Sequence, residues 1–320
     1  MTRSFNEAFI DQLTVNNILG PGAPGPVSAG QKFYVMSAPA LGGQYPSSPF
    51  TTIAAALASC VASRGDTIYV CEGHAETLTL ALMVNKIGVT IIGLGNGTNR
   101  PAITVNGTIP GFNMTAANVK VYNMRIISGS SVAVTTRLTR IAASNVKFIG
   151  CQFESAYRLY HQHVILSGDK DAYEDCVFIS TYSQAAGTAG IKAQTCVLNI
   201  GGTNARVFGC RFNDMGGDKA NRWKACVEGG KLTANLEVEK CFFMCRGIAT
   251  RTRSAGASGL MSTIDCRAIS PSSNTSSGAL YTPTYQYVIQ SYDVAAVNKV
   301  STIAVTTASD IRLKTGVMYL

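Results

Sequence analysis

Short runs of alternating apolar and polar residues recur along most of the chain, and they predict β-strands. An aromatic or aliphatic residue usually lies two positions after the end of each run, as at Ile126, Phe153, Phe178, Phe212 and Phe243. A second apolar column lies upstream in each unit, so every repeat holds at least two strands. Aligned on one register, the runs end at Leu94, Met124, Cys151, Cys176, Cys210, Cys241 and Cys266, with intervals of 30, 27, 25, 34, 31 and 25 residues.

Repeats of this length indicate a solenoid, and their variable length indicates loops of different sizes on one side. We therefore predict an all-β chain that forms a right-handed parallel β-helix of roughly eight coils, stacked at the interstrand spacing of about 4.8 Å. Equivalent residues of successive coils would then lie above one another. The seven aligned residues from Leu94 to Cys266 are predicted to form an interior stack, because small polarizable thiols fill a narrow core well.

Two segments stand apart from the repeats. Thr51–Ala62 is an Ala-rich amphipathic pattern that predicts a helix capping the first coil, whose edge would otherwise be exposed. Near the N-terminus, Phe5, Phe9 and Leu13 recur at the spacing of one helix face, with Ile10 beside them, and a Gly/Pro-rich linker follows. The predicted organisation is an arm and linker over 1–30, the β-helix with its capping helix over 31–270, and C-terminal strands, last coils or an association element over 271–320.

Composition narrows the class of protein further. Hydrophobic residues make up 46% of the chain and charged residues 14%, which excludes a long disordered protein and a coiled coil. The formal net charge of +9 comes from scattered basic residues, so we expect no dedicated nucleic-acid stripe. The densest basic region surrounds Trp223, and docking on an acidic protein explains it as well as nucleic acid does; it comprises Arg222, Lys224, Arg246, Arg251 and Arg253.

The ten cysteines are widely spaced and have no accompanying histidine cluster, so a zinc site is not expected. No apolar segment follows Arg3 as in a signal peptide, and the longest apolar stretch, Ile53–Ala62, is about half of what crosses a bilayer. We therefore expect no membrane association. Synthesis in a reducing host cytoplasm would leave the thiols free and buried.

Three segments resemble the pectate-lyase-like β-helix proteins of tailed-phage virions. They are PFTTIAAAL at 49–57, RGDTIYVCEGHAETL at 64–78 and VTIIGLGNGTNRPAI at 89–103, and the likeness extends over about residues 31–270. The resemblance implies a virion protein, commonly a homotrimer. It does not fix an activity, because the superfamily includes lyases, hydrolases, tailspikes and inert capsid-surface proteins.

Acidic clusters are the first candidates for chemistry. Asp214 and Asp218 could form the carboxylate pair that a glycoside hydrolase needs across a groove. A second cluster combines Asp169 and Asp171 with Glu174 and Asp175. Both sets are interpreted here as turn residues, since nearby Lys and Arg residues favour ordinary surface pairing and the motifs of polygalacturonase-like hydrolases are absent.

Histidines and glycines supply weaker candidates. His74 and Glu76, and likewise His161 and His163, could share a strand face and hold a metal, the second pair around a trimer axis. Gly93–Gly97 resembles a dinucleotide-binding loop but lacks its third spaced glycine. We interpret all three as structural, and expect no metal and no cofactor.

The function expected from the sequence is a non-enzymatic virion protein that decorates and stabilises a phage capsid. It would lie on the capsid surface as a homotrimer, with the major capsid protein as its partner and with Phe5, Phe9, Ile10 and Leu13 as arm anchors. The alternative is a tail spike or fibre that binds host-surface polysaccharide, with or without cleaving it. Neither hypothesis includes a membrane or a specific nucleic acid.

Overall fold

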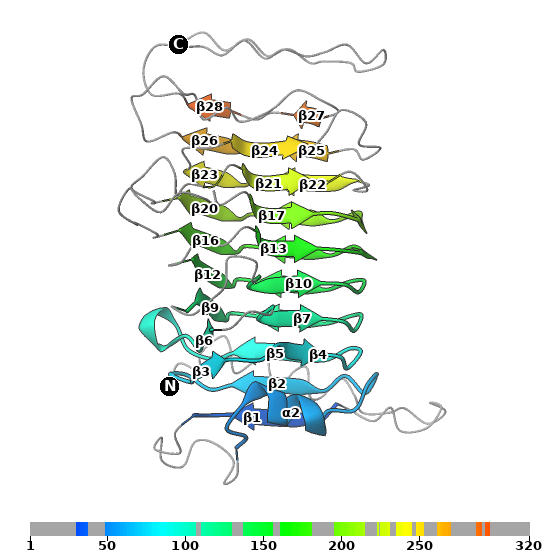
Figure 1. Ribbon diagram of the computed structural model, residues 1–320, viewed down its shortest axis with the longest axis vertical. Coiled ribbons are helices and arrows are strands. Elements are labelled where there is room, and N and C mark those ends of the chain that lie inside the picture. The colour runs from blue at the N-terminus through cyan, green and yellow to red at the C-terminus, as the bar shows by residue number, and fades with distance from the viewer. Residues whose placement is uncertain are drawn as a thin grey trace, which may run out of the picture.

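The chain winds into a parallel β-helix in which three sheets run the length of the rod (Figure 1). The computed structural model describes residues 30–37, 49–106, 110–129, 137–155, 161–180, 195–214, 223, 225–230, 235–244, 248–252, 261–269, 286–289 and 292–294. Every strand pair in the three sheets is parallel, and successive coils are hydrogen-bonded neighbours. The predicted fold, a right-handed parallel β-helix, is confirmed.

Sheet A has ten strands, sheet B nine and sheet C seven. Sheet A contains β1 (Lys32–Val35), β2 (Thr67–Val70), β5 (Thr90–Gly93), β8 (Lys120–Tyr122), β11 (Lys147–Ile149), β15 (Ala172–Glu174), β19 (Arg206–Phe208), β22 (Leu236–Glu239), β25 (Met261–Ile264) and β27 (Gln286–Ile289). Sheet B contains β3 (Ala75–Leu78), β6 (Ala102–Val105), β9 (Arg125–Ser128), β12 (Gln152–Ser155), β16 (Val177–Ser180), β20 (Arg211–Asp214), β23 (Phe242–Met244), β26 (Arg267–Ile269) and β28 (Tyr292–Val294). Sheet C contains β4 (Leu82–Val84), β7 (Phe112–Met114), β10 (Thr139–Ile141), β13 (His161–Ile165), β17 (Thr195–Asn199), β21 (Ala225–Gly229) and β24 (Ile248–Thr252).

Each coil runs from sheet A through sheet B to sheet C. A short additional pair, β14 (Gly168–Asp169) and β18 (Gly202–Thr203), lies between sheets C and A. The single α-helix of the described residues, α2 (Ile53–Ser59), lies beside β1 at the N-terminal end of the rod (Figure 1). Its Thr52 hydroxyl accepts the first-turn amide of Ala55, and Ile53, Ala56 and Leu57 are buried against the coil. The predicted cap is therefore present, although it is shorter than the predicted range.

The corner between sheets A and B explains the repeat seen in the sequence. From the third coil onward it has two residues, the first with positive φ and the second buried. Asn123, Gly150, Asp175, Gly209, Lys240 and Asp265 occupy the first position, with φ between 48° and 64°. A left-handed residue reverses the chain sharply, and this turn directs the next side chain into the core.

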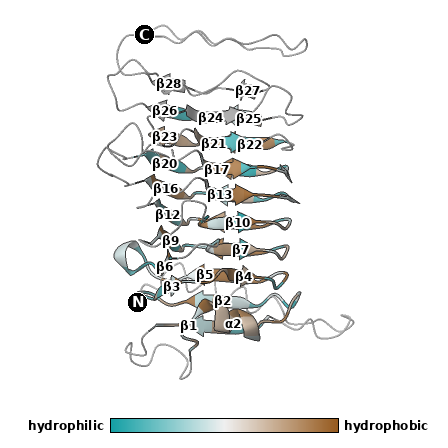
Figure 2. Cartoon of the chain, in the orientation of Figure 1, coloured by the Kyte–Doolittle hydropathy of each residue, from teal (hydrophilic) through white to brown (hydrophobic). Residues whose placement is uncertain are grey.

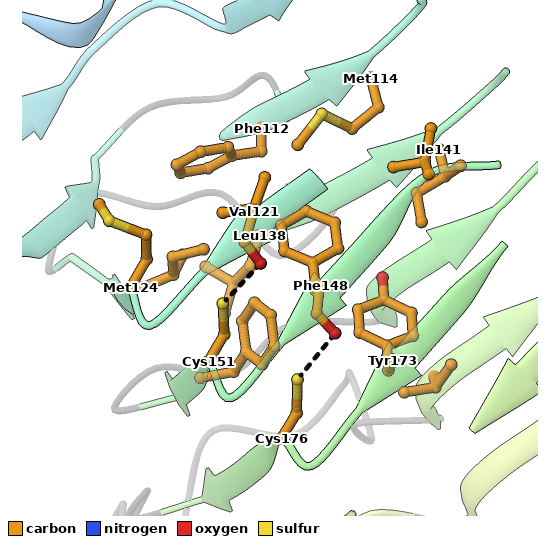
Figure 3. Close-up of a cluster of buried hydrophobic side chains, with 14 of the residues drawn as sticks. Phe112, Met114, Val121, Met124, Leu138, Ile141, Phe148, Cys151, Tyr173 and Cys176 are labelled. Atoms are coloured by element: carbon orange, nitrogen blue, oxygen red, sulfur yellow. Dashed lines mark hydrogen bonds between the residues drawn. The ribbon is translucent and has the colours of Figure 1, made fainter. Parts of the chain in front are cut away.

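The second corner position carries most of the predicted interior stack. Met124, Cys151, Cys176, Cys210, Cys241 and Cys266 are all buried there, with at most 2% of the residue exposed. Each of these thiols also donates to backbone carbonyls. The Sγ of Cys176 lies 3.3 Å from the Phe148 oxygen (Figure 3) and 3.3 Å from the Glu174 oxygen. Burial raises the pKa of the Cys176 thiol well above its ordinary value, which keeps it protonated as a donor.

Leu94 departs from the predicted stack. It is half-buried, because Gly93 before it lacks a positive φ and the chain continues along sheet A for one more residue. A wider loop containing the 3₁₀ helix η1 (Gly97–Asn99) follows, and the Asn123 amide closes it by donating to the carbonyls of Gly93 and Gly95. Cys71 holds the equivalent position one coil earlier and is fully buried, although the sequence alignment left it out.

Aromatic side chains of sheet B form the core beside the thiols. Phe153, Phe178, Phe212 and Phe243 stack face to face, with centroid separations of 5.0, 4.7 and 4.9 Å between neighbours. These separations match the interstrand spacing of about 4.8 Å, so the backbone register places one ring per coil. Figure 2 shows the resulting alternation of apolar and polar positions along the strands.

The predicted arm and most of the C-terminal segment lie outside the described residues. Those parts include Phe5, Phe9, Ile10 and Leu13 and nearly all of 271–320. Within the C-terminal segment, the backbones of β27 and β28 continue sheets A and B by one further strand each. Both strands lie within the segment 271–320, for which C-terminal strands or last coils are among the predictions.

The ring stack yields a stability prediction. Phe178→Ala should lower the free energy of unfolding by about 3–5 kcal/mol, because it leaves a cavity between two stacked rings. Ile179→Ala, one residue along on the outer face, should cost about 1 kcal/mol or less. Chemical denaturation followed by circular dichroism measures both variants, and equal losses would contradict the assignment of inner and outer faces.

Candidate functional site

The outer face of sheet A carries a continuous column of large side chains on its first five strands. The column, called here the tyrosine lane, consists of Tyr34, Tyr69, Ile92, Tyr122 and Ile149, which are register partners in successive strands. All five are partly exposed. Beside them runs a more polar column of Lys32, Thr67, Thr90, Lys120 and Lys147.

The side chains of the lane stand out from the sheet. The Tyr34 and Tyr69 rings stack with centroids 5.4 Å apart and planes inclined by 22°, so their faces cover one another. An apolar body with a polar tip suits a ligand that presents both C–H surfaces and hydroxyl groups. Lys32 and Lys120 have no ion-pair partner among the described residues.

Farther along the same face of sheet A, charged side chains form ion pairs with one another. The Lys147 ammonium lies 2.9 Å from the Glu174 carboxylate, and Arg206 pairs with Glu237 at 2.9 Å and also with Glu239. The Arg206 guanidinium also stacks over the Phe208 ring, 4.2 Å from its centroid. The lane therefore ends near Ile149, at the start of this charged network.

Sheet C carries a pair of arginines, Arg137 and Arg140, called here the arginine pair. Arg140 lies in β10, and its Nη1 donates to the Oδ1 of Asn113 at 2.9 Å. Arg137 precedes the strand and is half-buried. Burial and the nearby positive charge of Arg140 lower the pKa of the Arg137 guanidinium. The positive charge of Arg140 thus disfavours the charged form of Arg137, which is already partly buried.

The carboxylates predicted as a hydrolase pair do not form one among the described residues. Asp214 is the last residue of β20 and is buried, with 2% of its surface exposed. Its Oδ2 accepts a hydrogen bond from the backbone amide of Trp223 at 3.1 Å. Asp218 lies outside the described residues. Asp214 is therefore a buried structural carboxylate, rather than the exposed turn residue expected from the sequence.

The second acidic cluster is also divided by the fold. Glu174 faces outward to Lys147 and Asp175 is an exposed corner residue, whereas Asp171 is fully buried. Asp169 accepts hydrogen bonds from the Asn204 amide at 2.7 Å and the Thr203 hydroxyl at 3.0 Å. These four residues therefore share no site. Asp175 is an exposed turn residue as expected, whereas the expectation is wrong for Asp171, which is fully buried.

Asp171 and Asp66 occupy equivalent register positions but differ in environment. Asp66 binds the Arg64 guanidinium through both carboxylate oxygens, which lowers the pKa of Asp66. Asp171 accepts only the Val146 amide at 2.8 Å, and its Oδ2 has no hydrogen-bond partner within the described part of the chain. Burial therefore raises the pKa of Asp171 to about 7.

His74 and His163 make structural contacts, and the side chain of His161 lies outside the described set. His74 is buried with its Nε2 3.3 Å from Glu76, and the same Glu76 oxygen accepts the first helical amide of α2, from Ile53. His163 lies inside the coil, with its Nδ1 2.8 Å from the Thr139 hydroxyl, and burial lowers its pKa to about 3. An interior His163 cannot reach a trimer axis.

The remaining sequence candidates offer no further site within the described residues. Trp223 is 1% exposed and packs edge-on to Phe212, so it offers no platform for nucleic-acid bases. The side chains of the basic residues around it lie outside the described set. Within the described part, no group of three or more His, Cys, Asp and Glu side chains could hold a metal ion, and no helix is long and apolar enough to cross a membrane.

Sequence reasoning missed both the tyrosine lane and the arginine pair. A signal is present in the sequence: Ile92, Tyr122 and Ile149 each lie two positions before the aligned residues Leu94, Met124 and Cys151, and Tyr69 has the same spacing to Cys71. An exposed apolar residue by itself is uninformative, so these positions do not predict a site without the register between strands. The register between strands places these four residues, which are far apart in the sequence, in one column.

Comparison with known proteins supports the fold. No protein-family model and no curated protein matches the chain. Among solved structures, a rhamnogalacturonan lyase is similar at 15% identity over 75% of this chain and 68% of that chain, with a TM-score of 0.53. A pectin methylesterase in complex with a hexasaccharide matches at 13% identity over 84% and 91%, with a TM-score of 0.49. A Geobacillus virus E2 protein, ORF18, matches at 13% identity over 76% and 56%, with a TM-score of 0.38.

These similarities correct one expectation. From the sequence we expect a protein without enzymatic activity, and this expectation is wrong as an inference from the fold, because rhamnogalacturonan lyase, an enzyme by its name, has a similar structure. At these identities the likeness shows the fold alone. The chain is therefore a parallel β-helix protein whose fold is similar to that of rhamnogalacturonan lyase.

The environment of Asp171 yields a pH prediction. With a folded pKa of about 7 and an ordinary unfolded value near 3.9, Asp171 binds its proton more tightly in the folded state. Its contribution to stability is therefore present below about pH 4 and is lost as the pH rises to 7. Asp171→Asn should flatten this decline and be more stable than the wild type above pH 7, measured as melting temperature against pH.

Asp66→Asn provides the contrast. The pKa of Asp66 is lower in the folded than in the unfolded state, so its ionised carboxylate stabilises the fold at pH values above the unfolded pKa. Asp66→Asn should therefore lower the melting temperature most at neutral pH and approach the wild type in acid. Parallel pH profiles for wild type and Asp171→Asn would contradict the proposed environment of Asp171.

Proposed function

We propose that this chain is a polysaccharide-binding β-helix protein of a tailed-phage virion, which holds host-surface polysaccharide along the tyrosine lane. The observation that carries the proposal is the lane itself, five register-matched and partly exposed side chains beside a polar column. A polysaccharide is a repeating polymer, and a ladder with one equivalent side chain per coil can make the same contact many times.

The chemistry of the lane suits sugars. The edges of Tyr69 and Tyr122 and the side chain of Ile92 offer apolar contact to sugar C–H groups, while the phenol and Thr90 hydroxyls can exchange hydrogen bonds with sugar hydroxyls. The unpaired Lys120 adds attraction for acidic substituents. Rhamnogalacturonan lyase, with the same fold, acts on a polysaccharide by its name, and that analogy gives secondary support.

The virion assignment rests on the sequence resemblance over residues 31–270. In this proposal, residues 1–30 attach the rod to another virion protein through Phe5, Phe9, Ile10 and Leu13, and the chains form a homotrimer. A tail spike fits polysaccharide binding directly. The second candidate is attachment to the capsid, with the major capsid protein as partner. The apolar pattern of the arm fits attachment to the tail and attachment to the capsid equally well.

Substitution in the lane tests the proposal. Tyr122→Ala should weaken binding to a bacterial surface polysaccharide by about fivefold, because one aromatic contact contributes about 1 kcal/mol. Ile127→Ala, in the same coil but on the outer face of sheet B, is the matched control and should bind normally. An array of bacterial surface polysaccharides identifies the ligand, and size-exclusion chromatography of the incubated polymer reports its processing. Equal binding by both variants would rule out the lane.

Deletion of residues 2–30 tests the attachment. The truncated chain should keep the circular dichroism spectrum and melting behaviour of the rod but fail to bind particles that lack the native protein. Sedimentation with such particles measures attachment. Normal co-sedimentation of the truncated chain would remove the arm from the proposal.

A further inference from the structure

The arginine pair lacks the ion pairs with carboxylates that three other arginines form. Arg64 lies 2.6 Å from Asp66, Arg125 lies 2.7 Å from Glu154, and Arg206 bridges Glu237 and Glu239. Arg137 and Arg140 form no ion pair with any carboxylate in the described ranges. Their positive charges are therefore not compensated by any described carboxylate, whereas Arg125 on sheet B and Arg206 on sheet A are paired.

The pair is also held in place. Asn113 accepts from Arg140 through its Oδ1, while its own Nδ2 lies 3.1 Å from the Met83 sulfur, which fixes the orientation of the amide. The Nε of Arg137 is buried and has no hydrogen-bond partner among the residues described. A buried donor without a partner is costly, and so is the proximity of two cations. A bound anion would remove both penalties.

We infer that Arg137 and Arg140 form a binding site for an oxyanion, such as the carboxylate of an acidic sugar or a sulfate or phosphate group. Guanidinium groups bind planar oxyanions through two parallel hydrogen bonds, and partial burial strengthens such bonds. The site lies on sheet C, apart from the tyrosine lane on sheet A. It therefore does not depend on the lane, and it adds a preference for acidic ligands.

Calorimetric titration of the full chain with three probes tests the inference: inorganic sulfate, trigalacturonic acid, and the neutral maltotriose. Sulfate and trigalacturonic acid should bind with an affinity that falls as salt is added, and maltotriose should not bind here. Arg137→Gln and Arg140→Gln should each weaken anion binding by about tenfold. Arg211→Gln, an exposed arginine of sheet B, is the control and should bind like the wild type.

The probes also separate the sources of the oxyanion. Tighter binding of trigalacturonic acid than of sulfate assigns the site to an acidic sugar, and equal binding assigns it to a free inorganic oxyanion. Melting curves of all variants establish that they are folded. Anion binding that survives both Arg137→Gln and Arg140→Gln, or no anion binding by the folded wild type, would overturn the inference. Because Tyr122→Ala alters only the lane, failure of the two sites can be told apart.

Discussion

The parallel hydrogen-bond register between successive coils is the constraint on which the rest of this molecule depends. Each strand pairs with its equivalent one coil away, so every residue is placed directly over its counterpart. From the third coil onward, the left-handed residue at the corner between sheets A and B keeps this register by turning the chain at the same point in each coil. A shift by one residue would exchange the inner and outer faces of a strand.

Two kinds of ladder follow from this register. Inside, thiols and phenyl rings repeat at the interstrand spacing and exclude water, and the thiols also satisfy corner carbonyls. Outside, the same repetition aligns side chains of one type into columns, such as the tyrosine lane on sheet A. A rod with regularly spaced surface columns suits an extended polymer, because each repeating unit of the ligand can contact an equivalent side chain of the protein.

The sequence predicted the interior better than the exterior. The thiol column was visible because Cys151, Cys176, Cys210 and Cys241 are rare residues at one aligned position. Leu94 was misplaced because the two-residue corner begins only in the third coil, and the backbone angle of Gly93 cannot be read from its identity. Glycine accepts both signs of φ, so the sequence leaves this choice to the surrounding loop.

Charges were the least predictable feature. Asp66 and Asp171 share a register position, yet one is neutralised by an arginine two residues away and the other is buried with a single amide donor. The arginine pair likewise arises from the absence of nearby carboxylates in three dimensions, which spacing along the chain does not reveal. Local sequence indicates which residues carry charge, whereas the fold determines which charges meet.

A crystal structure of the rod with a bound oligosaccharide tests the central claim most directly. The account predicts a sugar chain extended along the rod axis over sheet A, with successive rings contacting Tyr69, Ile92 and Tyr122 in turn. A sugar chain lying across the rod axis, or one seated on sheet B with the lane uncovered, would contradict it.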